Sequence, residues 1–152
     1  MLICSSPKFS NSADWPGIKT KVLDFFTQQQ ALDFTRTLQR FLSIQAMGSV
    51  NAKQDTKTIK QVVQQFPLPS PIALSAGLDM LQNIDLREQF KTLLIPCHMF
   101  LGRLDTLVPD KLAPQMQYLN SKVTLEVISD ASHAPFISDT EFFAKRLIKV
   151  LI

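Results

Sequence analysis

The 152-residue sequence lacks several features that would define its class at once. No apolar run approaches the roughly 20 residues that a membrane-spanning helix needs, and the first residues carry no charged leader of the kind found in signal peptides. Only two cysteines occur, Cys4 and Cys97, both within apolar segments, which favours small buried thiols over a redox or nucleophilic role. These absences predict a cytoplasmic protein without a membrane contact.

Glycine is scarce as well, and its four positions are Gly17, Gly48, Gly77 and Gly102. None of them belongs to a G-x-S-x-G motif, the tight strand-to-helix turn that presents a nucleophilic serine. No linker or low-complexity tract divides the chain, whose length is that of one domain. The sequence thus predicts one folded unit with no nucleophile elbow.

The charge is unevenly distributed. Residues 1–60 contain eight Lys/Arg and four Asp/Glu, a net charge of +4, whereas residues 61–152 contain eight and nine, a net charge of −1. This excess is too small, and too poor in interleaved aromatic residues, to predict nucleic-acid binding. It favours a modest basic face for an acidic partner.

Two apolar segments in the last third of the chain are each followed by a residue whose side chain can accept or donate a proton. The predicted strand 97–101 is stopped by Gly102 and followed by Asp105, and the predicted strand 123–127 is followed by His133. Alone, such an Asp is usually a turn former, and a single loop His carries little information. Because the carboxyl ends of parallel strands meet at one edge of a sheet, we expect the two side chains to converge.

The remaining pattern is strand, helices, strand, helix, strand, helix. Residues 1–5 resemble the end of a buried strand, residues from 16 to about 90 follow helical spacing over four or five helices, and strand character returns near Leu93. Parallel strands with right-handed crossovers are expected. We therefore expect a core strand and entry loop in 1–15, a helical lid in 16–90 and a βαβα part in 91–152. The chain begins on a core strand, whose hydrogen-bonding partners must come from elsewhere. We therefore expect it to be the later part of a longer protein.

Several local expectations follow from the same pattern. Asp33 should cap the second helix, and Pro109 should lie in the first turn of a crossover helix. Ser138 and Glu141 predict a capping box that opens the last helix. The helical spacing also places four apolar side chains of the third helix inward, namely Ile59, Val62, Val63 and Phe66. The spacing of Ile72, Leu74, Leu78 and Leu81 indicates one more helix.

Several strings also carry a family resemblance. G-x-x-D-x-L-V-P followed by A-x-H-A-P-F is similar to the end of the α/β-hydrolase family. The strings C-S-S-P-K-F-S, D-W-P-G-I-K, R-F-L-S-I-Q-A-M-G and A-S-H-A-P-F-I-S resemble the pimeloyl-[acyl-carrier protein] methyl ester esterases of biotin synthesis. The resemblance covers essentially the whole chain but only the later three-fifths of such an enzyme. It implies about three parallel strands with crossover helices, the C-terminal part of an α/β-hydrolase fold, plus an inserted helical lid.

The resemblance also implies roles for particular residues. Asp105 and His133 match the acid and base of a Ser-His-Asp triad, whose chemistry needs no metal or organic cofactor. A lid segment that lines the acyl pocket corresponds to Phe41, Leu42, Ser43, Ile44 and Gln45. Contacts with the acidic acyl-carrier protein correspond to Arg36, Arg40, Lys53 and Lys57. Considered without the resemblance, Phe41 and Leu42 could equally be helix core, and the four cations a solvated helix face.

Three functions remain open at this point. The first is hydrolysis of the methyl ester of a pimeloyl chain on acyl-carrier protein by a serine carboxylesterase that is monomeric in its family; without the elbow, this chain alone is expected to be inactive toward esters. The second keeps the fold but uses an Asp nucleophile, as dehalogenases and epoxide hydrolases do. The third is a non-catalytic fragment that binds a carrier protein, or another chain through its exposed first strand.

Overall fold

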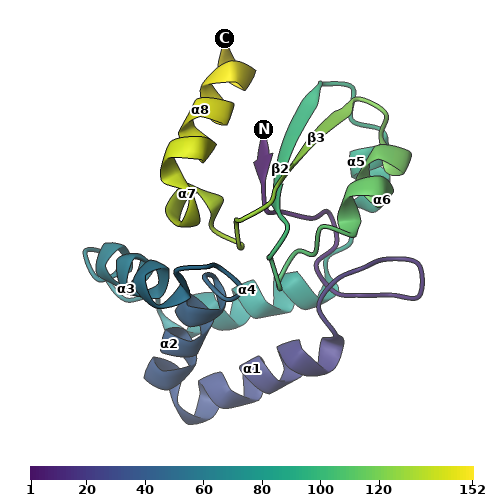
Figure 1. The fold of residues 1–152 in the computed structure, drawn as a ribbon. Coiled ribbons are helices and arrows are strands. Elements are labelled where there is room, and N and C mark those ends of the chain that lie inside the picture. Colours follow the sequence, from purple (N-terminus) through teal and green to yellow (C-terminus); the bar gives the residue numbers. More distant parts are fainter.

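The computed structural model describes residues 1–152 as a small parallel sheet with helices on both faces and a group of helices at one end (Figure 1). The sheet has the order β1 (Leu2–Ile3), β2 (Cys97–Gly102) and β3 (Val123–Ile128), and both neighbouring pairs are parallel. This confirms the predicted arrangement of about three parallel strands with crossover helices. The helices are α1 (Thr20–Leu32), α2 (Phe34–Ile44), α3 (Ala52–Val63), α4 (Pro71–Asn83), α5 (Arg87–Lys91), α6 (Leu112–Leu119), α7 (Pro135–Ser138) and α8 (Thr140–Leu151).

The central strand β2 is buried on both faces. Met99 and Leu101 point into a cluster with α6, whereas Phe100 points to the opposite face and meets Phe143 of α8 edge to face, with ring centroids 5.4 Å apart. Side chains of a strand alternate between the faces of its sheet, so a run of consecutive apolar residues is what a strand covered on both sides needs. The sheet therefore forms a rigid base for the loops that leave its carboxyl edge.

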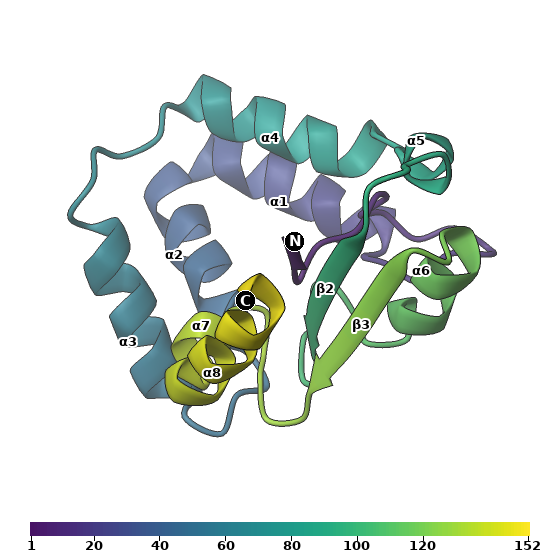
Figure 2. The same cartoon turned by 90° about the horizontal axis from the view of Figure 1, so that it is seen from above.

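Five helices, α1 to α5, separate β1 from β2, and the first four lie together beyond the carboxyl ends of the strands (Figure 1). Helix α1 packs against both α2 and α4, and α3 packs against α7 of the sheet region (Figure 2). No helix is both long and apolar enough to cross a membrane. The helical group thus covers the edge of the sheet at which Asp105 and His133 are found.

Some helix ends were predicted well and others were not. Asp33 caps α2 as expected, because its side chain accepts a hydrogen bond from the Arg36 backbone N–H at 2.9 Å. The capping box at Ser138 is wrong: Ser138 ends the short helix α7, and Asp139 caps α8. Helix α6 begins at Leu112, so Pro109 lies in the turn before it.

The helix faces also differ from the expectation at two positions. Val62 and Phe66 were predicted to point inward but are 45% and 66% exposed. Helix α3 buries only the narrow stripe around Ile59 against α2 and α7, and Phe66 lies beyond its end. A helix at the surface of a small molecule has one covered face, and apolar residues outside that stripe remain in solvent.

Candidate active site

The loops after β2 and β3 bring a carboxylate and an imidazole into direct contact. The Nδ1–H of His133 donates a hydrogen bond to Oδ2 of Asp105 at 2.8 Å. The Asp105 side chain is completely buried, and that of His133 is 22% exposed. A carboxylate bound at Nδ1 fixes the tautomer of the ring and leaves Nε2 as the nitrogen that can accept a proton. The arrangement thus has the geometry that a general base needs.

Asp105 is held in place by its own loop. Its Oδ1 accepts hydrogen bonds from the backbone N–H groups of Leu107 at 2.7 Å and Val108 at 3.0 Å, and its own N–H donates to the carbonyl of Gly102 at 3.2 Å. A buried carboxylate is tolerated when its oxygens are hydrogen-bonded. The two N–H donors therefore satisfy Oδ1 and direct Oδ2 toward His133.

The loop that carries Asp105 (residues 103–111, here the acid loop) passes very close to the loop that carries His133 (residues 129–134, here the base loop). A Cβ at Gly102 would lie 2.2 Å from the carbonyl oxygen of Ser132 and 2.6 Å from that of Ala131. The Leu104 N–H donates to the Ala131 carbonyl at 3.0 Å and ties the loops together. Only glycine allows this approach, so the residue that stops β2 also determines the distance between Asp105 and His133.

A third side chain, Cys4, lies beside the pair. It follows β1 in a left-handed backbone conformation with φ of 42°, and its thiol donates to the Ser132 carbonyl at 3.8 Å. Burial, reinforced by the nearby negative charge of Asp105, raises the pKa of the Cys4 thiol to about 12. The protonated thiol is a poor nucleophile, in line with the inert buried thiol expected from sequence. Its position next to Asp105 was not foreseen, although it too follows a strand at the carboxyl edge.

Cys4, Asp105 and His133 are also the residue types that bind metal ions, and one ligand atom from each lies within 4.8 Å of the others. The thiol, however, is protonated at neutral pH, and both oxygens of Asp105 already accept hydrogen bonds. Metal ligation would require loss of the thiol proton and of the hydrogen bond between Asp105 and His133. The geometry suits proton transfer better than ligation.

The predicted acyl-pocket segment 41–45 points in several directions, as consecutive residues of a helix must. Phe41 and Ile44 line an enclosed apolar cavity, whereas Leu42 is buried in a core cluster with Ala134. Ser43 borders a groove on the other side of α2. The backbone carbonyl of Gln45 accepts a hydrogen bond from the Ser132 hydroxyl at 3.1 Å. Two of the five side chains therefore face the enclosed cavity, and the end of α2 is attached to the base loop.

Three of the four predicted basic residues line a groove of about 840 Å³ between α1, α2 and α3. Arg36, Arg40 and Lys53 border it, together with Lys60, which the sequence reasoning did not select. Lys57 is exposed on α3 but does not line the groove. The spacing of seven residues from Lys53 to Lys60, two turns of helix, is the signal that could have identified Lys60.

The groove and the acid loop share an apolar connection. The enclosed cavity is lined by ten hydrophobic residues, among them Leu107 of the acid loop. Three of its lining residues, Val22, Phe26 and Ile44, also line the basic groove. The enclosed cavity, of about 20 Å³, thus lies between the basic groove and Leu107, the residue whose N–H donates a hydrogen bond to Asp105.

Comparison with known proteins gives the same family as the sequence strings. The pimeloyl-[acyl-carrier protein] methyl ester esterase of Aliivibrio salmonicida is 47% identical over 149 residues, a match that covers 98% of this chain and 57% of the relative. The esterase of the same name from Aliivibrio fischeri is 48% identical over 145 residues, covering 95% of this chain and 56% of the relative. The chain thus spans a little more than half the length of these relatives, and it corresponds to their C-terminal part.

A solved structure supports the fold independently. An esterase from Exiguobacterium antarcticum superposes with a TM-score of 0.82 at 18% identity, over 95% of this chain and 53% of that protein. At this identity the likeness bears on the fold alone. None of the protein-family models matches the sequence.

Proposed function

Since this chain is a homologue of the pimeloyl-[acyl-carrier protein] methyl ester esterases, we propose that it supplies the acid, the base and the lid of a serine carboxylesterase acting on that class of substrate. The observation that carries the proposal is the hydrogen bond between Asp105 and His133 beneath a basic helical lid. The esterase names of relatives at 42% to 48% identity favour a serine nucleophile over the Asp nucleophile of dehalogenases.

In the proposed reaction, Nε2 of His133 removes the proton of a serine hydroxyl as the serine oxygen attacks the ester carbonyl. Asp105 stabilises the imidazolium that forms. Collapse of the tetrahedral intermediate breaks the bond to the methoxy group, which leaves as methanol with the proton from His133. Water then attacks the acyl-enzyme with the same imidazole as base and releases the acid. The serine must come from a G-x-S-x-G segment, which these 152 residues do not contain.

The lid supplies the second half of the proposal. Arg36, Arg40, Lys53 and Lys60 concentrate positive charge at one groove, which suits the acidic surface of an acyl-carrier protein. The acyl chain would then lie against the apolar side chains between this groove and Leu107, and the ester would reach His133. Guanidinium groups bind carboxylates in a bidentate manner, so Arg36 and Arg40 should contribute more than the lysines.

A chimera tests the catalytic part. The first two-fifths of the Aliivibrio salmonicida esterase, joined ahead of Met1, should hydrolyse pimeloyl methyl esters on acyl-carrier protein. The change His133→Ala should reduce kcat/KM by about 10³-fold or more, because removal of a triad member leaves only residual catalysis. His98, the other histidine, lies within β2 and hydrogen-bonds Thr124, so His98→Ala is the matched control and should keep the activity.

Two results would refute the proposed role. One is a folded chimera that hydrolyses esters equally well with and without His133. The other is a purified 152-residue chain that hydrolyses p-nitrophenyl butyrate above background and loses this activity with His133→Ala, since that would place the nucleophile within this chain.

Carrier-protein binding without catalysis is a second candidate, because the basic groove is formed by α1 to α3 and does not depend on the Asp-His pair. The isolated chain should bind acyl-carrier protein more weakly as ionic strength rises. Arg40→Glu should weaken binding strongly, and Lys57→Glu, outside the groove, should weaken it less. Binding that is indifferent to salt and to Arg40→Glu would exclude this contact.

A further inference from the structure

Ser132, the residue before His133, is completely buried and is held at two of its polar groups. Its hydroxyl donates a hydrogen bond to the backbone carbonyl of Gln45, just past the end of α2, at 3.1 Å. Its own carbonyl accepts the thiol of Cys4, which follows β1, at 3.8 Å. The residue next to the base is therefore attached to the lid through its side chain and to the sheet through its backbone.

Both neighbours of His133 in the sequence contact the end of α2. The carbonyls of the last turn of a helix have no partner inside it, and the Ser132 hydroxyl supplies one for Gln45. Ala134, on the other side of His133, is buried in the same apolar cluster as Leu42 and Ala46. A displacement of the end of α2 would therefore reach the base loop on both sides of the imidazole.

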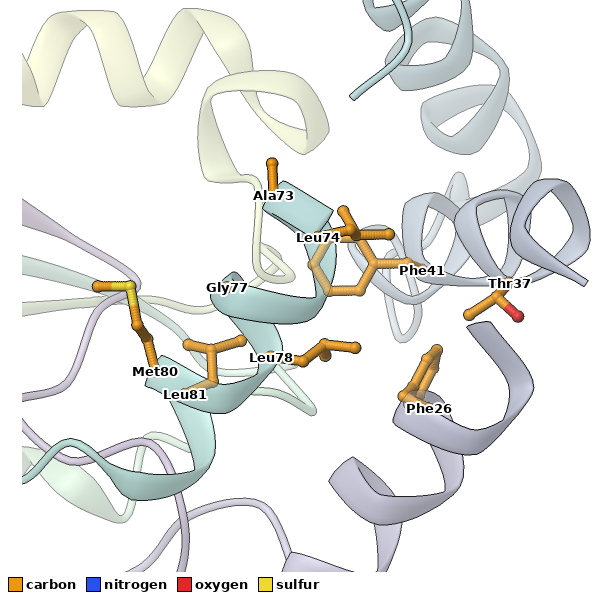
Figure 3. A pocket seen from close by; sticks show the side chains of 9 residues that line it. All are labelled: Phe26, Thr37, Phe41, Ala73, Leu74, Gly77, Leu78, Met80 and Leu81. Carbon is orange, nitrogen blue, oxygen red and sulfur yellow. The ribbon is translucent and has the colours of Figure 1, made fainter. Parts of the chain in front are cut away.

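Helix α2 is in turn fixed within the lid. The ring of Phe41 meets that of Phe26 in α1 edge to face, with centroids 6.4 Å apart. Phe41 also borders an apolar groove of about 360 Å³ along α4, opposite Leu74 (Figure 3). Closely packed elements transmit displacements to their neighbours, so the position of α1 and α4 determines where Gln45 lies.

The imidazole depends on this backbone for its alignment. The structure gives the ring one hydrogen bond, from Nδ1 to Asp105 at 2.8 Å, whereas Asp105 is fixed separately by the N–H groups of Leu107 and Val108. A hydrogen bond weakens steeply as its donor and acceptor move out of line. Any shift of the base loop relative to the acid loop therefore weakens the bond between His133 and Asp105.

We propose that Ser132 is a positioning residue: its hydroxyl fixes the base loop to the end of α2, so that His133 is aligned with Asp105 only while α2 keeps its place in the lid. The role of His133 as a base rests on the proposed function, whereas the link between lid and loop rests on the contacts above. The lid then aligns the base in addition to contacting the substrate.

Proton NMR of the isolated chain tests this. The Nδ1–H of His133 gives a downfield signal, assigned by its loss in His133→Ala, and its rate of exchange with water measures how often the bond to Asp105 opens. Ser132→Ala should raise this rate about fivefold, the effect of one typical hydrogen bond on an equilibrium constant. Ser138→Ala is the matched control, because that hydroxyl bonds the Ala134 carbonyl within its own helical turn, and it should leave the rate unchanged.

A double-mutant cycle separates positioning from a general loss of stability. Phe41→Ala loosens α2 in the lid and should raise the exchange rate several-fold by itself, but should add little to the effect of Ser132→Ala, since the link is then already broken. Backbone amides of β2, at the centre of the sheet, report global opening and should exchange equally in all variants. Should Ser132→Ala fail to fold, Ser132→Cys, whose thiol is a weaker donor, replaces it in the cycle.

An unchanged rate in Ser132→Ala, additive effects of the two changes, or a parallel rise in the β2 amides would each overturn the proposal. Because no ester is present in these spectra, an inactive chimera would count against the esterase function without affecting this result.

Discussion

Two glycine-to-alanine changes should have opposite effects on stability. Gly48 follows α2 with φ of +94°, and a Cβ there would lie 2.5 Å from the carbonyl oxygen of Leu104. Gly77 is inside α4 with open space at its Cβ position. The same added methyl group therefore meets a rigid backbone atom in one case and nothing in the other.

The expected free energies follow from these environments. A left-handed conformation costs an alanine about 1–2 kcal/mol. The Leu104 carbonyl cannot retreat easily, because the N–H of Leu104 is bonded to Ala131 and the next residue is the buried Asp105. Together these effects should reduce the free energy of unfolding of Gly48→Ala by roughly 2–4 kcal/mol. Gly77→Ala should increase it by roughly 0.5–1 kcal/mol, since alanine restricts the unfolded chain and favours the helix.

Thermal unfolding followed by circular dichroism measures the difference. In a chain of this length about 1 kcal/mol corresponds to roughly 2–4 °C, so the two variants should differ in Tm by roughly 5–20 °C. Urea titration gives the same comparison at constant temperature. A Gly48→Ala variant as stable as Gly77→Ala would show that the loop after α2 does not press against the Leu104 carbonyl.

Three further measurements test local features. Asp33→Ala removes the N-cap of α2 and should lower the free energy of unfolding by about 1 kcal/mol in urea titration; no change would mean that the cap is absent in solution. Hydrogen bonds from Arg87 lower the pKa of Asp85 to about 2, so its stabilising contribution is complete above the ordinary pKa near 4 and is lost as pH falls through about 2. The stability difference between the wild type and Asp85→Asn should therefore be present at pH 7 and shrink below pH 4, and a difference that grows on acidification would contradict the pairing. Cys4, with its pKa raised to about 12, should resist iodoacetamide at pH 8 in the folded chain and react after unfolding in urea; rapid alkylation of Cys4 in the folded chain would show that it is exposed or activated.

The convergence of Asp105 and His133 could be predicted because it depends on topology. Two apolar runs, each too short for a helix and followed by a loop, indicate parallel strands, and their carboxyl ends must share an edge. The structure places the two side chains 2.8 Å apart there. The exposure of Val62 could not be predicted in the same way, since periodicity shows which residues share a helix face but not whether a partner covers it.

The residues around the Asp105–His133 pair could not be predicted from the sequence, for a related reason. Cys4 reaches Asp105 only because β1 ends beside β2, and a strand of two residues leaves almost no pattern to place it. The groove along α4 requires three helices to meet at particular angles, and no property of Gly77 in the sequence indicates that its Cβ position faces open space. Contacts between elements distant in sequence, not the elements themselves, were the missing information.

Helix α2 connects these features mechanically. Its outer face carries Arg40 at the basic groove, its inner face carries Phe41 at the apolar cavity, and the Gln45 carbonyl just past its end is bonded to Ser132, the residue before His133. Five residues of helix span roughly 7–8 Å, and a helix does not stretch. Under the proposed function, the position at which a carrier protein docks is thereby held at a constant distance from the base, so a chain of one length places its ester at Nε2. A break in α2, rather than a change at either end, is the perturbation that should uncouple binding from hydrolysis.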